Sequence, residues 1–336
     1  MDIVALSQCL QPHVTVPTLR QFHRIAGALL VMTGRVTMLG LSRWPGPGGS
    51  YRTVQRFFST VIPWVTLFWV FFRQHLSRPG DVSLLAGDEV VVTKAGNPPH
   101  GLDRFFASLD GTPVPGLACF TLSWVSTQER RSFPGHVEQG VRRDAEKAAS
   151  KAKAAAKKQT SSTDTRRRGR PQGRKNKNKA EVTLPPELGR ITRMITALLQ
   201  RIAAYLSLTS LVLDGHFGHH NALHMARQGH MPLLSTLRSD SALYLPYTGL
   251  YAGRGPHRTD GDKVDDDNLP VPYLKETTVE KHVKTALYQR PLLHKAFVQP
   301  LHVGLIVKTN LQTQARAHVV LFRRDLGLAY DKLVDS

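Results

Sequence analysis

The spacing of apolar residues changes several times along the chain, and each change predicts a different kind of element. Residues 17–32 are amphipathic with a helical period, and in residues 51–60 Tyr51, Val54 and Phe57 recur at helical spacing. From residue 82 onward the pattern becomes one of apolar, β-branched runs of strand length, at 84–93, 105–110 and 113–126. A helical region therefore precedes the first strands of a sheet.

The second half of the chain alternates helices with buried strands. Residues 186–206 predict a strong amphipathic helix, followed by a strand at 208–214, a short helix at 219–228 and a strand at 231–237. One face of the first helix carries Leu188, Ile191, Ile195, Leu198 and Ile202. This order predicts an α/β fold with at least one right-handed crossover.

Beyond residue 238 the chain is rich in Gly, Pro, Tyr and charge, with short apolar runs at 282–289, 295–310 and 316–324. We interpret residues 238–325 as a β-rich insertion. The last stretch, 326–336, resembles the first turns of a further helix.

Positive charge is concentrated in one segment. The chain has a formal net charge of +20, and residues 141–180 alone contain 15 Lys and Arg against three Asp and Glu. Charge of this size indicates a polyanionic partner, with nucleic acid ahead of membrane. The second half of this segment has the low-complexity composition of a disordered linker.

Cysteine content and hydropathy exclude other classes. With only Cys9 and Cys119, the chain has neither a disulfide framework nor a thiolate zinc site, which fits a reducing, intracellular setting. The N-terminus lacks the basic region of a signal peptide. The longest apolar run, 61–72, is too short to span a bilayer, so we expect a buried helix and no membrane partner.

Two acidic residues stand within or at the end of apolar strands. Asp88 lies in LLAGDEVVVT and Asp214 ends LTSLVLD. An unpaired charge in such a strand is costly, so the carboxylate usually meets a cation, a donor or a metal. If the two strands are neighbours, Asp88 and Asp214 supply the oxygen ligands that Mg²⁺ or Mn²⁺ needs for phosphodiester chemistry.

Several basic residues are candidate DNA contacts. Arg52 and Arg56 lie on the polar side of a helix that follows a Gly-rich turn, which fits either a helix-turn-helix reader or a bundle with a solvated basic face. Arg168 and Arg170 form an Arg-Gly-Arg-Pro string that suits either an A·T minor groove or a solvated linker. The remaining candidates are Lys94, Arg254, Arg258 and Lys263.

Histidines cluster after Asp214. His220 and His224 have an i, i+4 spacing that zinc can use, but the sequence offers no evident third soft ligand. We therefore favour polar residues beside a DNA-facing edge over a zinc site.

Three strings together resemble insertion-sequence transposases of the DDE superfamily. They are LAGDEVVVTKAG around Asp88, SLVLDGHFGHHNAL around Asp214, and STLRSDSALYLPYTGLYAGRG at 235–255. The resemblance implies a ribonuclease H-like mixed sheet with flanking helices, an N-terminal helical region and a β-rich insertion. It also implies that Asp88 and Asp214 are the first two acids of a catalytic triad binding Mg²⁺ or Mn²⁺.

The implied organisation has four parts. Residues 1–80 form a helical DNA-binding region, and 81–237 form the catalytic core, which the basic linker 141–182 interrupts. The insertion spans 238–325, and 326–336 begins a C-terminal helix. The family's third acid is a Glu on that helix, and no residue here matches it, which suggests a truncated copy.

The expected function is a transposase that cuts double-stranded DNA at element ends and joins them to a target. The alternatives are a catalytically inactive truncated transposase that only binds DNA, and an unrelated basic RNA-binding protein. The resemblance implies a homodimer as the candidate assembly and a cytoplasmic, nucleoid-associated location.

Overall fold

A computed structural model of the chain describes residues 3–44, 50–78, 82–94, 99–107, 110–142, 148, 152, 182–202, 208–238, 241–251, 253, 257–265, 269–297 and 299–323. The chain divides into two compact units, Met1–Asp81 and Val82–Ser336. Candidate residues Arg168, Arg170 and Arg254 lie outside the described residues, as does the segment 326–336 for which the sequence suggested a helix.

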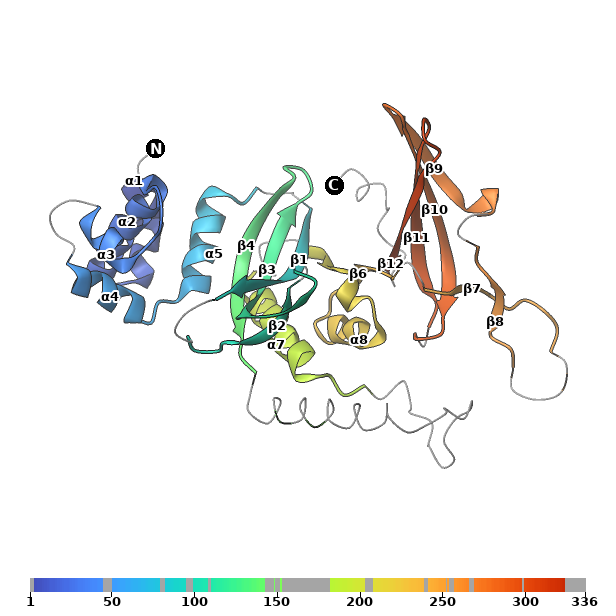
Figure 1. The fold of residues 1–336 in the computed structure, drawn as a ribbon, viewed down its shortest axis with the longest axis horizontal. Helices are drawn as coiled ribbons and strands as arrows, with labels where there is room; N and C mark the ends of the chain where they lie inside the picture. The colour runs from blue at the N-terminus through green and yellow to red at the C-terminus, as the bar shows by residue number, and fades with distance from the viewer. Residues whose placement is uncertain are drawn as a thin grey trace. The chain divides into compact units, whose positions relative to one another are not determined.

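The first unit is helical (Figure 1). Its elements are α1 (Ile3–Ser7), the 3₁₀ helix η1 (Gln8–His13), α2 (Val16–Val31), α3 (Met38–Arg43), α4 (Tyr51–Ser59) and α5 (Trp64–His75). The hydroxyls of Thr37 and Ser50 accept hydrogen bonds from the first turns of α3 and α4, which is why those helices begin there. A shared core contains Leu10, Leu19, Ile25, Ala28, Leu41, Val54, Phe57, Ile62 and Leu67.

The apolar run at 61–72 forms most of α5, and Leu67, Trp69 and Phe72 are buried, as the sequence predicted. Within the described ranges, no single helix is long and apolar enough to cross a membrane. Helices α4 and α5, bent by 92° relative to each other, pass that test only as a pair.

The second unit contains the predicted mixed sheet. Its first part comprises β1 (Ser83–Thr93), β2 (Asp103–Ala107), β3 (Thr112–Ser126), β4 (Arg131–Gly140), α7 (Pro186–Ile202), β5 (Leu208–Leu213), the 3₁₀ helix η2 (Gly215–Phe217), α8 (His220–Gln228) and β6 (Leu233–Thr236). Strand β3 pairs antiparallel with both β4 and β1, whereas β1, β5 and β6 pair in parallel. The order β4-β3-β1-β5-β6 with flanking helices is the predicted ribonuclease H-like arrangement.

The two faces of this sheet differ in burial. Alternate residues of β3, from Ala118 to Trp124, are almost fully buried and share a face with Leu85 and Gly87 of β1. Helix α7 contacts β3 and β4 on this side, and its Ile191 and Ile195 have no exposed surface. We call this side the α7 face. Residues on the opposite face of β3 are half-buried.

The insertion continues the same sheet. It contains β7 (Leu243–Pro246), β8 (Asp260–Lys263), the 3₁₀ helix η3 (Val271–Tyr273), β9 (Leu274–Glu280), β10 (Val283–His294), β11 (Leu301–Asn310) and β12 (Arg316–Arg323). Strand β12 pairs antiparallel with β6, so the described strands of core and insertion form one 12-stranded sheet. Backbone hydrogen bonds therefore join the insertion directly to the core.

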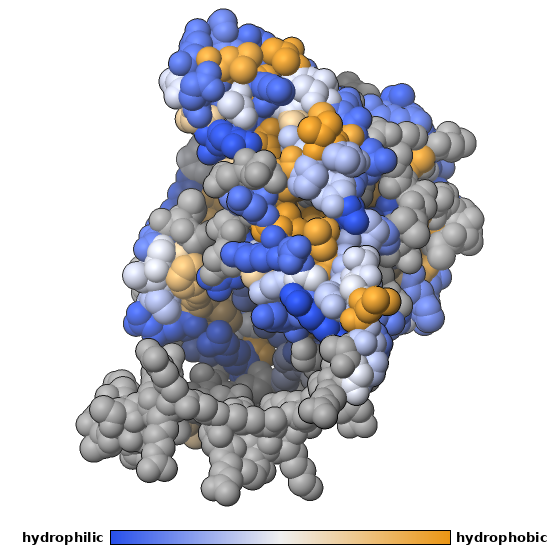
Figure 2. All heavy atoms as spheres, turned by 90° about the vertical axis from the view of Figure 1, so that its right-hand side faces the viewer, coloured by the Kyte–Doolittle hydropathy of each residue, from blue (hydrophilic) through white to orange (hydrophobic). Residues whose placement is uncertain are grey.

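The surface of the insertion is mixed. All residues of β9 are exposed, and the side of the molecule viewed in Figure 2 shows apolar side chains in orange among blue polar ones. Exposed apolar side chains of the insertion include Leu250, Val271 and Val279.

Strand β4 is absent from the sequence prediction. Its Pro134 and Gly135 are typical of a turn, yet the structure accommodates them at a register shift opposite Ser123. Gly135 lies so close to the Trp124 ring that a Cβ would overlap it. Gly135, which disfavours a strand in the sequence, is thus the residue that allows β4 to pass close to the Trp124 ring. The strand predicted at 105–110 begins earlier, at Asp103.

Candidate active site

Asp88 and Asp214 lie at corresponding positions of two neighbouring parallel strands. Strands β1 and β5 pair in register from Ala86 and Val212 to Gly87 and Leu213. Asp88 directly follows Gly87, and Asp214 directly follows Leu213. The backbone of Asp214 is still extended, with φ −67° and ψ 176°. The neighbouring strands that the sequence argument required are therefore present.

The register also places both carboxylates on the same face. Gly87 and Leu213 are buried on the α7 face, so the residues that follow them, Asp88 and Asp214, point to the opposite face. Adjacent strands are about 4.8 Å apart, which puts the two side chains within reach of a common cation. Both residues are exposed, because the acids stand where the strands leave the buried part of the sheet.

Local hydrogen bonds orient the acids. Oδ1 of Asp88 accepts a hydrogen bond from the backbone N–H of Glu89 at 2.8 Å. The backbone oxygen of Asp214 accepts one from the hydroxyl of Ser235, in β6, at 2.7 Å. Asp214 occupies the N-cap position of η2, but its side chain makes no capping hydrogen bond. The Asp214 carboxylate is thus not used to cap η2.

A charged cluster lies on the α7 face, behind Asp88. Glu89 pairs with Arg190 of α7, with 3.8 Å between Oε1 and Nη2. Burial raises the pKa of Glu89, and the charge of Glu187 raises it further, while Arg190, His216 and Arg142 act in the opposite direction. No local pattern in the sequence marks this cluster, although Glu89 directly follows Asp88 and the first turns of the predicted helix at 186–206 carry Glu187 and Arg190.

A cavity of about 400 Å³ lies between the first turn of α7 and the start of α8. Its polar wall combines Glu187 and Asn221 with three histidines, and Phe217 and Leu188 line the apolar side. The cavity is lined by Pro185, Glu187, Leu188, His216, Phe217, His219, His220, Asn221 and Ala296. Three of the four histidines that cluster after Asp214 therefore line this cavity, and neither Asp88 nor Asp214 is among its lining residues. Within the described residues no group of three or more His, Cys, Asp or Glu could hold a metal ion.

His219 caps helix α8. Its Nδ1 accepts a hydrogen bond from the backbone N–H of Ala222 at 3.2 Å. Burial lowers the pKa of His219, and charge on His216 and His220 lowers it further, against the opposing effect of Glu187. A protonated Nδ1 could not accept this bond, so the folded chain favours neutral His219.

This cap predicts a loss of stability in acid. An unfolded histidine takes up its proton below about pH 6.5, whereas the folded one resists it, so the stabilisation is complete above that pH and declines as pH falls through the lowered pKa. Urea unfolding is expected to show a loss of about 1 kcal/mol between pH 7.5 and 5, and His219→Asn, which caps without titrating, is expected to reduce it. His136, whose pKa burial also lowers, leaves a residual dependence. An unchanged pH profile in His219→Asn would contradict this role.

The candidate DNA contacts in the first unit lie on the solvent face of α4. Arg52 and Arg56 are exposed, together with Gln55, while Val54 and Phe57 enter the core. The basic polar face predicted for this helix is present.

The other described candidates are Lys94 in the core and two residues of the insertion. Lys94 is exposed just after β1, where its N–H donates to Pro115. Arg258 is exposed, stacks over the Tyr247 ring at 5.0 Å and donates from Nε to the backbone oxygen of Asp260. Lys263 is exposed in β8, opposite Tyr244 of β7. In the insertion, Arg258 and Lys263 thus each lie next to a tyrosine, Tyr247 and Tyr244 respectively.

The strand order and the flanking helices define a ribonuclease H-like domain. The sequence profile of a protein family described as DDE superfamily endonuclease matches residues 9–291. The chain therefore belongs to the DDE superfamily of endonucleases, in agreement with the resemblance found in its sequence. A search of curated proteins finds no match.

Membership implies a nuclease or transposase type of enzyme with DNA as its substrate, and such enzymes normally use divalent metal ions. The donor set fits one: two adjacent, exposed carboxylates are the hard oxygen ligands that Mg²⁺ and Mn²⁺ prefer.

Proposed function

We propose that the protein is a transposase that cuts double-stranded DNA at the ends of an insertion element and joins the ends to a target, with Asp88 and Asp214 as metal ligands. The observation that carries this proposal is the register of β1 and β5, which sets the two acids side by side on one face. Rigid, hydrogen-bonded strands hold such ligands more firmly than loops do.

The proposed roles of the chain's residues follow from this position. A divalent cation, when bound, activates the attacking oxygen and stabilises the leaving oxygen of the phosphodiester. Asp88 and Asp214 would supply oxygen ligands for Mg²⁺ or Mn²⁺. Ser235 would hold the Asp214 backbone in place, and the Glu89 N–H would orient the Asp88 carboxylate.

The test is nicking of labelled element-end DNA by purified full-length protein with Mg²⁺ or Mn²⁺. Metal-dependent nicking and joining of 3′ ends support the proposal, and unrelated DNA of equal length serves as control. Sequence-dependent retardation of that DNA without nicking in either metal would instead support a second function, DNA binding without cleavage. The second function is kept because no third acid joins the pair within the described residues.

We further propose that α3 and α4 bind duplex DNA. Helix α4 buries Val54 and Phe57 and presents Arg52, Gln55 and Arg56 to solvent. An α-helix fits the major groove, where arginine pairs with guanine and glutamine with adenine. The N-terminal unit would thus recognise element ends.

This proposal predicts a specific change in binding. Arg52→Gln and Arg56→Gln are each expected to weaken binding to element-end DNA by about 10-fold, or 1–3 kcal/mol if the arginine reads a base. Electrophoretic mobility shift at several salt concentrations measures this loss. Arg20→Gln, which alters an exposed arginine of α2, is the matched control. Equal affinities for Arg20→Gln and both α4 variants would contradict DNA binding by α4.

The insertion and the assembly complete the proposal. Lys94, Arg258 and Lys263 are exposed cations that would contact DNA phosphates, which would make binding depend on salt. Joining two element ends requires two DNA-binding units, so a homodimer is the proposed assembly. Its test is native mass with and without element-end DNA.

A further inference from the structure

The end of β1 that carries Asp88 has less support than the rest of the strand. Its pairing with β5 stops at Gly87, while its pairing with β3 continues to Thr93. Residues from Asp88 onward are exposed or half-buried, whereas Leu84 and Leu85 are buried. The position of Asp88 therefore depends on whatever holds this part of β1.

Arg190 of α7 holds it from the α7 face. Its guanidinium approaches the Glu89 carboxylate at 3.8 Å, and its side chain is only 14% exposed. The same guanidinium lies against Gly140 of β4, where a Cβ would stand 2.7 Å from Nη1. A planar guanidinium with several donors suits such a position between strands. One side chain thus connects α7 to both β1 and β4.

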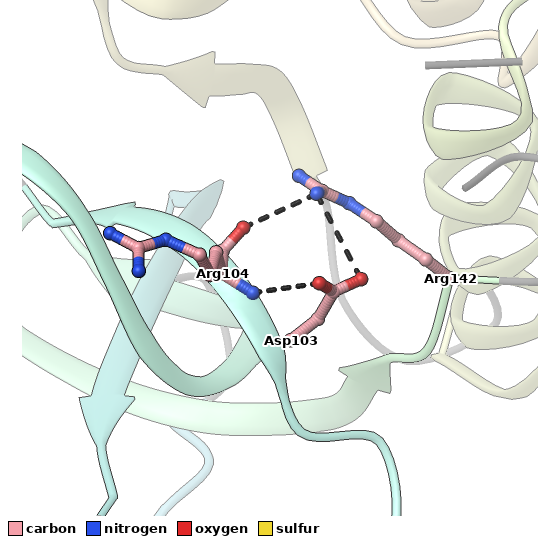
Figure 3. Close-up of polar contacts among 3 residues, drawn as sticks. All are labelled: Asp103, Arg104 and Arg142. Carbon is pink, nitrogen blue, oxygen red and sulfur yellow. Dashed lines mark hydrogen bonds and ion pairs between the residues drawn. The ribbon is translucent and has the colours of Figure 1, made fainter. Parts of the chain in front are cut away.

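A second arginine near Glu89 is directed elsewhere. Figure 3 shows Arg142 between the carboxylate of Asp103, 4.0 Å away, and the backbone oxygen of Arg104, to which it donates at 3.2 Å. Arg142 also stacks over the ring of Phe105. It therefore fixes β2 to the end of β4, and among the residues that the structure describes Arg190 forms the ion pair with Glu89.

The Glu89 peptide links this ion pair to the acid. Its side chain meets Arg190 on the α7 face, while its N–H donates to Oδ1 of Asp88 at 2.8 Å. We propose that Arg190 is a positioning residue for Asp88, which it orients for metal binding through Glu89. This inference rests on the proposed role of Asp88 and Asp214 as metal ligands. Residues that orient metal ligands typically contribute 10–100-fold to affinity.

Arg190→Gln separates positioning from simple electrostatics. Removal of a positive charge near a cation site strengthens metal binding by Coulomb's law. Loss of positioning weakens it instead, so the two explanations predict opposite signs. Arg193, an exposed arginine one turn further along α7, provides the matched control.

The experiment measures Mn²⁺ binding to the full chain by the electron paramagnetic resonance signal of free Mn²⁺. Arg190→Gln and Glu89→Gln are each expected to weaken binding by about 10-fold, while Arg190→Lys recovers part of the loss and Arg193→Gln has no effect. The double variant is expected to bind no more weakly than the weaker single one, because both act on one contact. Circular dichroism confirms folding. If Arg190→Gln fails to fold, Arg190→Lys takes its place, because it keeps the charge and changes only the geometry of the contact, so weaker Mn²⁺ binding than in the wild type still indicates positioning.

Two failures are distinguishable. Unchanged or tighter Mn²⁺ binding by Arg190→Gln, with binding still lost in Asp88→Asn and Asp214→Asn, overturns the role of Arg190 alone. Unchanged binding in Asp88→Asn and Asp214→Asn overturns the proposed metal site and this inference together.

Discussion

Replacing Asp214 with asparagine is expected to reduce nicking of element-end DNA by more than about 10³-fold, because a direct metal ligand should cost more than the 10–100-fold typical of its supporting residues. Asparagine keeps the volume of the side chain and removes its charge. Asp88→Asn is expected to have the same effect, since the two acids occupy matching positions on β1 and β5. Gel analysis of single-turnover nicking measures the change.

The control must show that DNA binding survives. Mobility shift is expected to give both variants the wild-type affinity within about twofold, since the arginines of α4 remain. Asp110→Asn, at an exposed position in the turn before β3, should nick at the wild-type rate. If Asp214→Asn also nicked at that rate, the two-carboxylate metal site would have to be abandoned.

Ile195→Ala is expected to lower the free energy of unfolding by about 2–5 kcal/mol, the range for deleting a large aliphatic side chain from a core. Ile195 has no exposed surface and belongs to the row of apolar residues by which α7 packs on the sheet. Its removal leaves a cavity that a rigid sheet cannot readily close. Urea unfolding followed by circular dichroism measures the loss.

The neighbouring Thr196 provides the comparison, because it is exposed on the same helix. Thr196→Ala is expected to change the unfolding free energy by no more than about 0.5 kcal/mol. A loss below about 1 kcal/mol for Ile195→Ala would mean that α7 is not packed as described.

The spacing of apolar residues predicted the helices and strands of the core, because within each of these elements the apolar residues repeat at one clear interval. Strand β1, helix α7, strand β5 and helix α8 all lie where the spacing of apolar residues placed them. The sequence placed Asp88 and Asp214 in two apolar strands but left open whether those strands are neighbours, and only the structure gives their adjacency and register.

What the sequence did not predict depends on contacts between distant segments. From the sequence alone Gly135 indicates a turn, and only its contact with the Trp124 ring explains why a glycine lies in this strand. The ion pair of Glu89 and Arg190 joins residues about a hundred positions apart, and no local pattern marks it. Likewise, nothing near β12 indicates that it pairs with β6 rather than only with its own hairpin partner.

The pairing of β12 with β6 has a mechanical consequence for Asp214. Ser235 stands opposite Phe322 of β12, and its hydroxyl grips the backbone oxygen of Asp214. Two contacts therefore separate β12 of the insertion from Asp214: the backbone pairing of β12 with β6 and the hydrogen bond of the Ser235 hydroxyl. A change in how β12 pairs with β6 is thus expected to displace the backbone of a residue proposed to hold the metal.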